Sequence, residues 1–189
     1  MRRGLLLAVA SIVAASALPA QTWTPALELR PFGGAYVPTG TQRDYFKDAS
    51  LLGLQGAIEL KPSFHVVGSF SWVDGKSKYN VGKANVDIFQ YDAGVELAAV
   101  KVLDRGWELK PFIGLGAGAR TYQFSSDQLS NKTCSIAYGA VGSELQIARI
   151  ALHLEARDNV FCYRSPIVGQ KSKTRNDLGL SLGIAYHVR

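Results

Sequence analysis

Long apolar runs and an excess of one charge are both missing from most of this sequence. Beyond residue 20, no uninterrupted apolar stretch approaches the roughly 20 residues that a membrane-spanning helix needs. We therefore expect no transmembrane helix after that point. The net charge is +6, and it falls to +4 without the two arginines at positions 2 and 3. So mild an excess does not require a nucleic-acid partner, and we expect none.

The N-terminus has the pattern of a secretory signal peptide. It opens with two arginines, continues with a short apolar core that ends at Leu18, and has small residues up to Ala20. We predict cleavage after Ala20, with cleavage after Ala17 as the alternative. No cysteine lies near this junction to carry a lipid anchor. We therefore expect residues 1–20 to be removed on export and residues 21–189 to form one domain.

Alternation with a period of two dominates the remaining chain, and it is clearest between Trp107 and Phe124. One set of alternate residues in this stretch is apolar, and the other carries charges, glycines and aromatic rings. A period of two indicates a β-strand. The stretch is longer than the five or six residues typical of globular strands, and a tilted strand crossing a bilayer needs about nine to eleven. Glycines among ionic groups suit a narrow polar lumen, so we expect the apolar set to face lipid.

The same alternation recurs eight times along the chain. The predicted strands are residues 26–38, 50–60, 64–73, 84–100, 107–124, 134–147, 150–163 and 177–188. Their connections are alternately long and short. Outer-membrane barrels have short periplasmic turns and long external loops, so the alternation predicts periplasmic termini. The outward aromatic residues form two girdles near the strand ends. They are Phe64, Trp107 and Tyr186 at the periplasmic side, and Trp72, Phe89 and Tyr91 at the external side.

This pattern resembles the small eight-stranded outer-membrane barrels, the group of the OmpA transmembrane domain and OmpX. The resemblance implies an all-β, eight-stranded antiparallel up-and-down transmembrane β-barrel in the outer membrane of a Gram-negative bacterium. It also implies contact with outer-membrane lipids and lipopolysaccharide, insertion by the outer-membrane assembly machinery, a monomeric state and no cofactor. A soluble lipocalin-like barrel would reverse the two faces, which the many charges of the inward set disfavour.

The inward set contains charges of both signs, which we predict to form an ion-pair network that fills the lumen. An eight-stranded barrel leaves an interior just wide enough for side chains, and buried charges need partners. The network is predicted to contain Glu28, Arg30, Glu59, Glu96, Glu108, Lys110, Glu144, Glu155 and Arg157. A narrow pore for ions or small solutes, gated by rearrangement of these pairs, is the alternative.

Histidine is scarce, with three in the chain, and all three have inward parity near the periplasmic end. His65, His153 and His187 together with Glu155 have the chemistry of a metal site. They lack the close spacing of a ligand motif, and the strand that carries His65 is predicted to lie across the barrel from the other two. Hydrogen-bonded lumen histidines are the favoured interpretation, and no metal is predicted.

The external end offers little for catalysis. Outer-membrane acyl hydrolases and acyltransferases resemble this chain in size and strand number, and as a family trait their catalytic histidine and serine lie toward the outer leaflet. No histidine of this chain maps there, and a serine-histidine-acid arrangement needs hydrogen-bond contact between its members. We predict a non-enzymatic protein with a role in envelope integrity or surface interaction, and a lipid-modifying enzyme is the remaining alternative.

Basic residues gather in two of the predicted external loops. They are Lys76, Lys78, Lys171, Lys173 and Arg175. Cations at this height can bind lipopolysaccharide phosphates or an acidic partner. A solvated rim without a ligand is the simpler interpretation.

The sequence contains only two cysteines, Cys134 and Cys162. In an exported chain such a pair predicts a disulfide. Both lie at the external end of a predicted hairpin centred near Ala148, but they fall on opposite alternation sets. A β-bulge near Asp158, whose carboxylate otherwise points at lipid, would bring them to one face. We predict a disulfide that braces two external loops.

Overall fold

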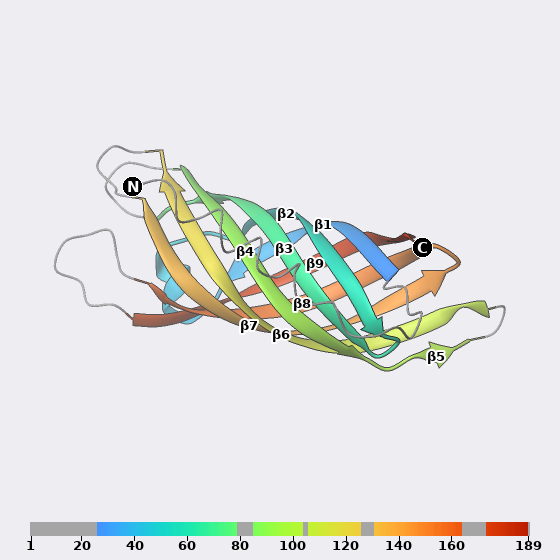
Figure 1. The fold of residues 1–189 in the computed structure, drawn as a ribbon. Helices are drawn as coiled ribbons and strands as arrows, with labels where there is room; N and C mark the ends of the chain where they lie inside the picture. Colours follow the sequence, from blue (N-terminus) through green and yellow to red (C-terminus); the bar gives the residue numbers. More distant parts are fainter. Residues whose placement is uncertain (1–25, 79–84, 104–105, 126–130, 164–172, 189) are drawn as a thin grey trace, which may run out of the picture.

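The computed structural model describes residues 26–78, 85–103, 106–125, 131–163 and 173–188, which form a barrel of long tilted strands (Figure 1). The long strands are β1 (Ala26–Pro38), β2 (Ala49–Lys61), β3 (Phe64–Lys76), β4 (Asn85–Ala98), β6 (Glu108–Phe124), β7 (Lys132–Ile147), β8 (Ile150–Tyr163) and β9 (Lys173–Val188). A two-residue strand, β5 (Lys101–Val102), and a 3-10 helix, η2 (Gly40–Asp44), complete the described elements. Within these ranges no helix is long and apolar enough to span a membrane. The predicted signal peptide lies outside the described residues.

The sheet closes on itself. Strand β1 pairs with both β2 and β9, and β4 pairs with β6, so the eight long strands form a ring in which every pairing is antiparallel. Closure satisfies the backbone hydrogen bonds that an open edge would leave unpaired, which a membrane environment demands. The predicted eight-stranded antiparallel barrel is confirmed.

The two faces of the wall differ as the alternation predicts. On β6, Ile113 and Leu115 are 60% and 69% exposed on the outside, whereas Lys110 and Arg120 are 9% and 2% exposed inside. The other long strands repeat this arrangement, with exposed leucine, valine and aromatic residues outside and charged residues buried inside. Apolar residues on the outside suit lipid, and the arrangement contradicts the lipocalin-like alternative.

One end of the barrel carries both described chain ends and the short connections, and we call it the turn end. Two-residue turns join β2 to β3 and β7 to β8 there, the second with Ala148 in the left-handed region at φ 57°. The predicted turn after the fourth long strand is more elaborate. Strand β4 ends at Ala98 instead of Val100, and β5 then pairs with the start of β6. This small hairpin projects beyond the barrel wall (Figure 1).

The opposite end carries the four long connections, and we call it the loop end. Strands β3 and β9 extend further toward it than predicted, to Lys76 and from Lys173. The connection between β1 and β2 contains η2 and folds over the barrel mouth. Its Phe46 forms an isolated β-bridge with Ser77, just beyond the end of β3, and is 1% exposed. The loop end is therefore covered by the chain's own first long connection.

Candidate functional site

A group of charged residues fills the lumen near the turn end, and Arg30 of β1 lies at its centre. Its Nε and Nη2 donate to the two carboxylate oxygens of Glu28, both at 3.0 Å. Its Nη1 donates to Glu96 Oε2 at 2.9 Å and to Gln55 Oε1 at 2.8 Å, and Nη2 lies 3.6 Å from Glu144. The guanidinium fork suits this arrangement because it presents several donors in one plane. We call Glu28, Arg30, Gln55, Glu96 and Glu144 the charged layer.

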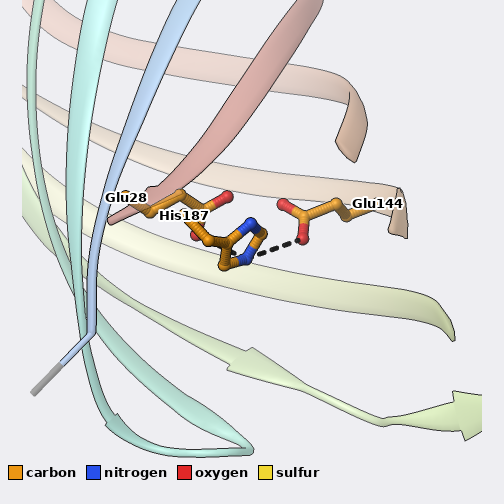
Figure 2. A group of neighbouring side chains, drawn as sticks. All are labelled: Glu28, Glu144 and His187. Atoms are coloured by element: carbon orange, nitrogen blue, oxygen red, sulfur yellow. Dashed lines mark ion pairs between the residues drawn. The ribbon is translucent and has the colours of Figure 1, made fainter. Parts of the chain in front are cut away.

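Two histidines from neighbouring strands approach the same carboxylate of this layer. His153 Nδ1 lies 3.4 Å from Glu144 Oε2, and its ring stacks on Phe112 at 4.8 Å. His187 Nε2 lies 3.8 Å from oxygens of both Glu28 and Glu144 (Figure 2). His65 instead lies 3.9 Å from Glu59. The structure therefore brings two of the three histidines together.

Arg157 of β8 lies further toward the loop end. Its Nε donates to Glu155 at 2.7 Å, and its Nη1 donates to both oxygens of Asp92 at 2.9 and 3.0 Å. The guanidinium also lies 4.0 Å from the centre of the Tyr138 ring. Ser69 donates to Asp92 at 2.6 Å. Asp92 thus joins the ion pairs of the lumen, although it is not in the predicted set.

Arg120 forms a further ion pair that the predicted network omits. It pairs with Asp177, which is fully buried, and its Nε donates to Gln90 Oε1 at 3.0 Å. Its guanidinium lies 4.7 Å from the centre of the Phe161 ring. The sequence held a signal for this pair, since Arg120 shares the inward parity of Lys110 on the same strand. Asp177 was harder to identify, because it is the first residue of the last predicted strand.

Glu59 and Glu108, two predicted members of the network, lie at the rim of the turn end. Lys110 Nζ is 3.5 Å from Glu108 and donates to Gln146 at 2.5 Å. The Glu108 side chain is 38% exposed, and that of Glu59 is 27% exposed. Both carboxylates therefore keep access to water, unlike Glu96 and Glu144.

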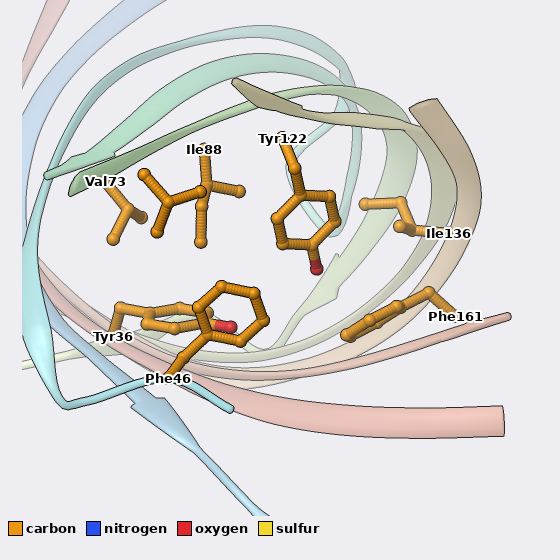
Figure 3. Packing of buried hydrophobic residues seen from close by; sticks show 8 residues of the cluster. Tyr36, Phe46, Val73, Ile88, Tyr122, Ile136 and Phe161 are labelled. Atoms are coloured by element: carbon orange, nitrogen blue, oxygen red, sulfur yellow. The ribbon is translucent and has the colours of Figure 1, made fainter. Parts of the chain in front are cut away.

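Toward the loop end, eight buried apolar and aromatic side chains pack in the lumen around the Arg120–Asp177 pair. We call them the apolar plug: Tyr36, Phe46, Val73, Val86, Ile88, Tyr122, Ile136 and Phe161 (Figure 3). Phe46, from the first long connection, stacks on Tyr122 with 5.6 Å between ring centroids. A cavity of about 30 Å³ lies beside the plug and is lined in part by Arg120 and Arg157. At roughly 30 Å³ per molecule in the liquid, it has room for one water molecule.

The two cysteines do not form the predicted disulfide, and both are free thiols. The pairing of β7 with β8 runs without a register shift from Ile136 opposite Phe161 to Ile147 opposite Ile150. The bulge expected near Asp158 is therefore absent from this pairing. Without it Cys134 keeps inward parity, whereas Cys162 is exposed on the outer face near Thr174. The structure does not show the predicted disulfide, because the wall of the barrel lies between the two side chains.

The predicted basic loop residues have different positions. Arg175 is 5% exposed inside the barrel, where it donates to Gln42 Oε1 at 2.9 Å and lies over the Tyr45 ring at 4.1 Å. Its assignment to an anion-binding loop is wrong, because β9 starts earlier than predicted. Lys76 and Lys78 are exposed at the loop end. Lys171 lies outside the described residues, and Lys173 is the first residue of β9.

No family model matches this sequence, and no curated protein sequence matches it either. Several solved structures share its fold. Neisserial surface protein A has a TM-score of 0.65 at 10% identity, covering 85% of this chain and 96% of that one. OprG from Pseudomonas aeruginosa has 0.59 at 14% identity, covering 88% and 97%. Ail of Yersinia pestis, solved with the heparin analogue sucrose octasulfate, has 0.53 at 16% identity, covering 88% and 100%.

These likenesses are too distant to transfer a function, but they establish the architecture. Each of the three structures is covered almost completely, so this chain matches them over the whole barrel. Its apolar exterior is the surface that lipid requires. The chain has the fold of the small eight-stranded outer-membrane β-barrels.

Proposed function

We propose that this chain is a non-enzymatic integral outer-membrane protein that acts through its barrel and its external surface and does not conduct solutes. The observation that carries this proposal is the filled lumen. The charged layer occupies the half toward the turn end, and the apolar plug occupies the half toward the loop end. A conducting barrel needs a continuous wetted path, and eight strands leave little space once side chains fill the interior.

The lumen also lacks support for acyl-transfer chemistry. Ser69 donates its hydroxyl proton to Asp92 and accepts a hydrogen bond from Arg157 at 3.3 Å. Nucleophilic serine chemistry needs a histidine in hydrogen-bond contact with the hydroxyl. Among the described residues no histidine makes such a contact with a serine.

The external surface presents a basic cluster, which we define as Arg43, Lys47, Lys76 and Lys78. Backbone hydrogen bonds hold the two segments that carry it side by side, from Lys47 N to Lys76 O at 3.2 Å and from Lys78 N to Tyr45 O at 2.7 Å. Lys78 Nζ also donates to the Arg43 carbonyl at 2.6 Å. Arg43 lies 3.6 Å from Asp48. Among the described residues, the three lysines have no carboxylate partner.

With the short turns in the periplasm, the basic cluster lies at the outer leaflet. It stands beyond the outward aromatic residues of β3 and β4, including Trp72, whose indole nitrogen donates to Asp87 at 2.9 Å. Phosphate groups of lipopolysaccharide occupy this height of the membrane. Clustered lysines attract phosphates through charge and hydrogen bonds. We infer that the cluster contacts lipopolysaccharide phosphates, which stabilises the envelope around the barrel.

The test is lipopolysaccharide binding by the refolded barrel in detergent. We expect the K47S/K76S/K78S variant to bind at least tenfold more weakly than the wild type, with a smaller dependence on salt. The matched control is K61S/K101S/R149S, which removes three exposed positive charges at the turn end. Dephosphorylated lipopolysaccharide should bind wild type and variant equally. An equal loss of affinity in the control, or no loss in the lysine variant, would overturn the assignment.

A further inference from the structure

Glu28, Glu144 and His187 come from three different strands and meet inside the barrel near the turn end. Each offers one ligand atom, and these atoms all lie within 4.8 Å of one another. Figure 2 shows the His187 ring directed between the two carboxylates. The three residues are 4%, 3% and 6% exposed. We propose that they form a binding site for a divalent metal ion of the zinc class, which goes beyond the function proposed above.

The charge balance around these residues favours a bound cation. Three buried carboxylates, Glu28, Glu96 and Glu144, converge on the single guanidinium of Arg30. The next pair of carboxylates, Glu155 and Asp92, shares the guanidinium of Arg157, and His153 Nε2 also lies 3.6 Å from Glu155. Five buried carboxylates therefore face two guanidiniums and one imidazole. Buried charges need compensation, and one divalent cation would supply most of it.

The two oxygens of Glu144 divide between Arg30 and the proposed ion, whereas Glu28 Oε2 faces His187 and also accepts a hydrogen bond from Arg30 at 3.0 Å. Glu144 turns Oε2 toward Arg30 and His153, whereas its Oε1 faces His187 at 3.8 Å. Arg30 therefore fixes the orientation of the carboxylate and leaves one oxygen for a ligand. Groups that orient metal ligands in this way commonly surround protein metal sites.

His187 is the second observation that points to a ligand. Its Nε2 lies 3.8 Å from one oxygen of each glutamate, which is beyond hydrogen-bonding distance. Its Nδ1 is buried and has no hydrogen-bond partner among the described residues. A ring that is buried between two carboxylates without a hydrogen bond to either is placed as a metal ligand would be.

Binding of zinc requires the three ligand atoms to move closer together. Zinc lies about 2.1 Å from nitrogen and oxygen ligands, so two ligand atoms of a tetrahedral site are about 3.4 Å apart. Both contacts of His187 Nε2 need to close by about 0.4 Å to reach that separation. The two glutamate oxygens, which lie within 4.8 Å of each other, need to approach by up to about 1.4 Å. Three protein ligands leave the fourth position of the zinc for water.

An ion can reach the site from the turn end. A hollow of about 350 Å³ opens there, and it is lined by Gly106, Glu108, Gln146, Ala148, Arg149 and His187. His187 thus borders both the hollow and the two glutamates. The hollow has a predominantly polar lining, which suits a hydrated cation. With the turn end in the periplasm, the site would take its metal from that compartment.

Binding of Zn²⁺ alone provides the test. The full barrel, refolded in detergent and stripped with a chelator, is titrated with Zn²⁺ in a calorimeter. We expect one ion per barrel, with affinity at least a hundredfold lower in H187Q and retained in the matched control H65Q. His65 is equally buried but pairs with Glu59 outside the cluster. No binding by the wild type, or equal binding by H187Q, would overturn the proposal.

A spectroscopic measurement covers the case in which H187Q fails to fold. The chain has three histidines, so ¹⁵N-histidine labelling gives three sets of ring signals, and H65Q removes one of them. We expect Zn²⁺ to shift the Nε2 signal of His187 and to leave that of His65 in place. A shift confined to His65, or no shift at all, would show that the ion does not occupy this site.

Discussion

The two halves of the lumen are closed by different means. The charged layer is held by ion pairs between side chains of β1, β4 and β7 and by a hydrogen bond to Gln55 of β2, all of which belong to the barrel wall itself. The apolar plug also uses wall residues, but Phe46 comes from the first long connection and folds in from outside. The first half follows from strand register alone, whereas the second also requires a loop to adopt one conformation.

This difference leads to different expectations for stability and dynamics. Removing one member of a buried ion-pair group leaves the other charges without compensation, which affects the whole layer. Removing a side chain from the plug leaves a cavity and lost contacts, and the effect stays local. The charged layer should therefore control whether the barrel folds, and the plug should control whether the loop end opens.

The largest effect is expected for Arg30→Ala. The substitution leaves Glu28, Glu96 and Glu144 buried around an empty position. Breaking such a group costs about 3–5 kcal/mol of unfolding free energy. Urea unfolding in lipid vesicles, followed by tryptophan fluorescence, measures it. Arg43→Ala is the control, because its side chain is 63% exposed and an exposed pair contributes less than about 1 kcal/mol. Equal midpoints for the two variants would contradict a charged layer.

A smaller and more local effect is expected for Phe46→Ala. The variant loses the stacking on Tyr122 and a side chain that is 1% exposed, at a cost of about 3 kcal/mol. Hydrogen exchange should increase at the loop end, while the amides around Arg30 stay protected. Thr41→Ala, an exposed change in the same connection, should alter neither region. Increased exchange around Arg30 in Phe46→Ala would show that the two halves are coupled.

The smallest difference in unfolding free energy is expected between variants of Glu96 and Glu108, two carboxylates that the alternation places equally in the lumen. Glu96→Ala removes a 2.9 Å charged hydrogen bond to Arg30 and should cost about 2 kcal/mol, since Arg30 keeps its other partners. Glu108→Ala should cost less than about 1 kcal/mol, because its side chain is 38% exposed. Paired unfolding curves compare them. If the Glu108 variant were as unstable as the Glu96 variant, the result would show that the buried layer extends to the rim.

Much of the fold could be predicted because strand alternation is a local property. Inward parity placed Arg30, Glu96 and Glu144 in the lumen without knowledge of the register. It could not say that Arg30 pairs with Glu96, because this contact joins β1 to β4 across the lumen and depends on the tilt of the barrel. The strand boundaries near Ala98 and Lys173 were missed for a related reason, since pairing partners decide where strands end.

The alternation of apolar and polar residues does not predict the loop conformation or the geometry of the cysteines. Phe46 lies in a polar segment with no periodicity, so nothing marked it as part of the apolar plug. The disulfide prediction assumed a bulge to reconcile Cys134 with Cys162, and the continuous register of β7 and β8 shows that the assumption was wrong. The alternation predicts that the last strand begins at Asp177, which places Arg175 in a loop, whereas β9 begins at Lys173.

Single-channel recording in planar lipid bilayers tests the central claim, the closed lumen, most directly. The refolded wild type should insert without producing discrete current steps at either polarity, while a large porin in the same bilayer conducts. Phe46→Ala should also remain silent, because the charged layer still fills the half toward the turn end. Steady openings in the wild type would contradict the account and would support the narrow pore.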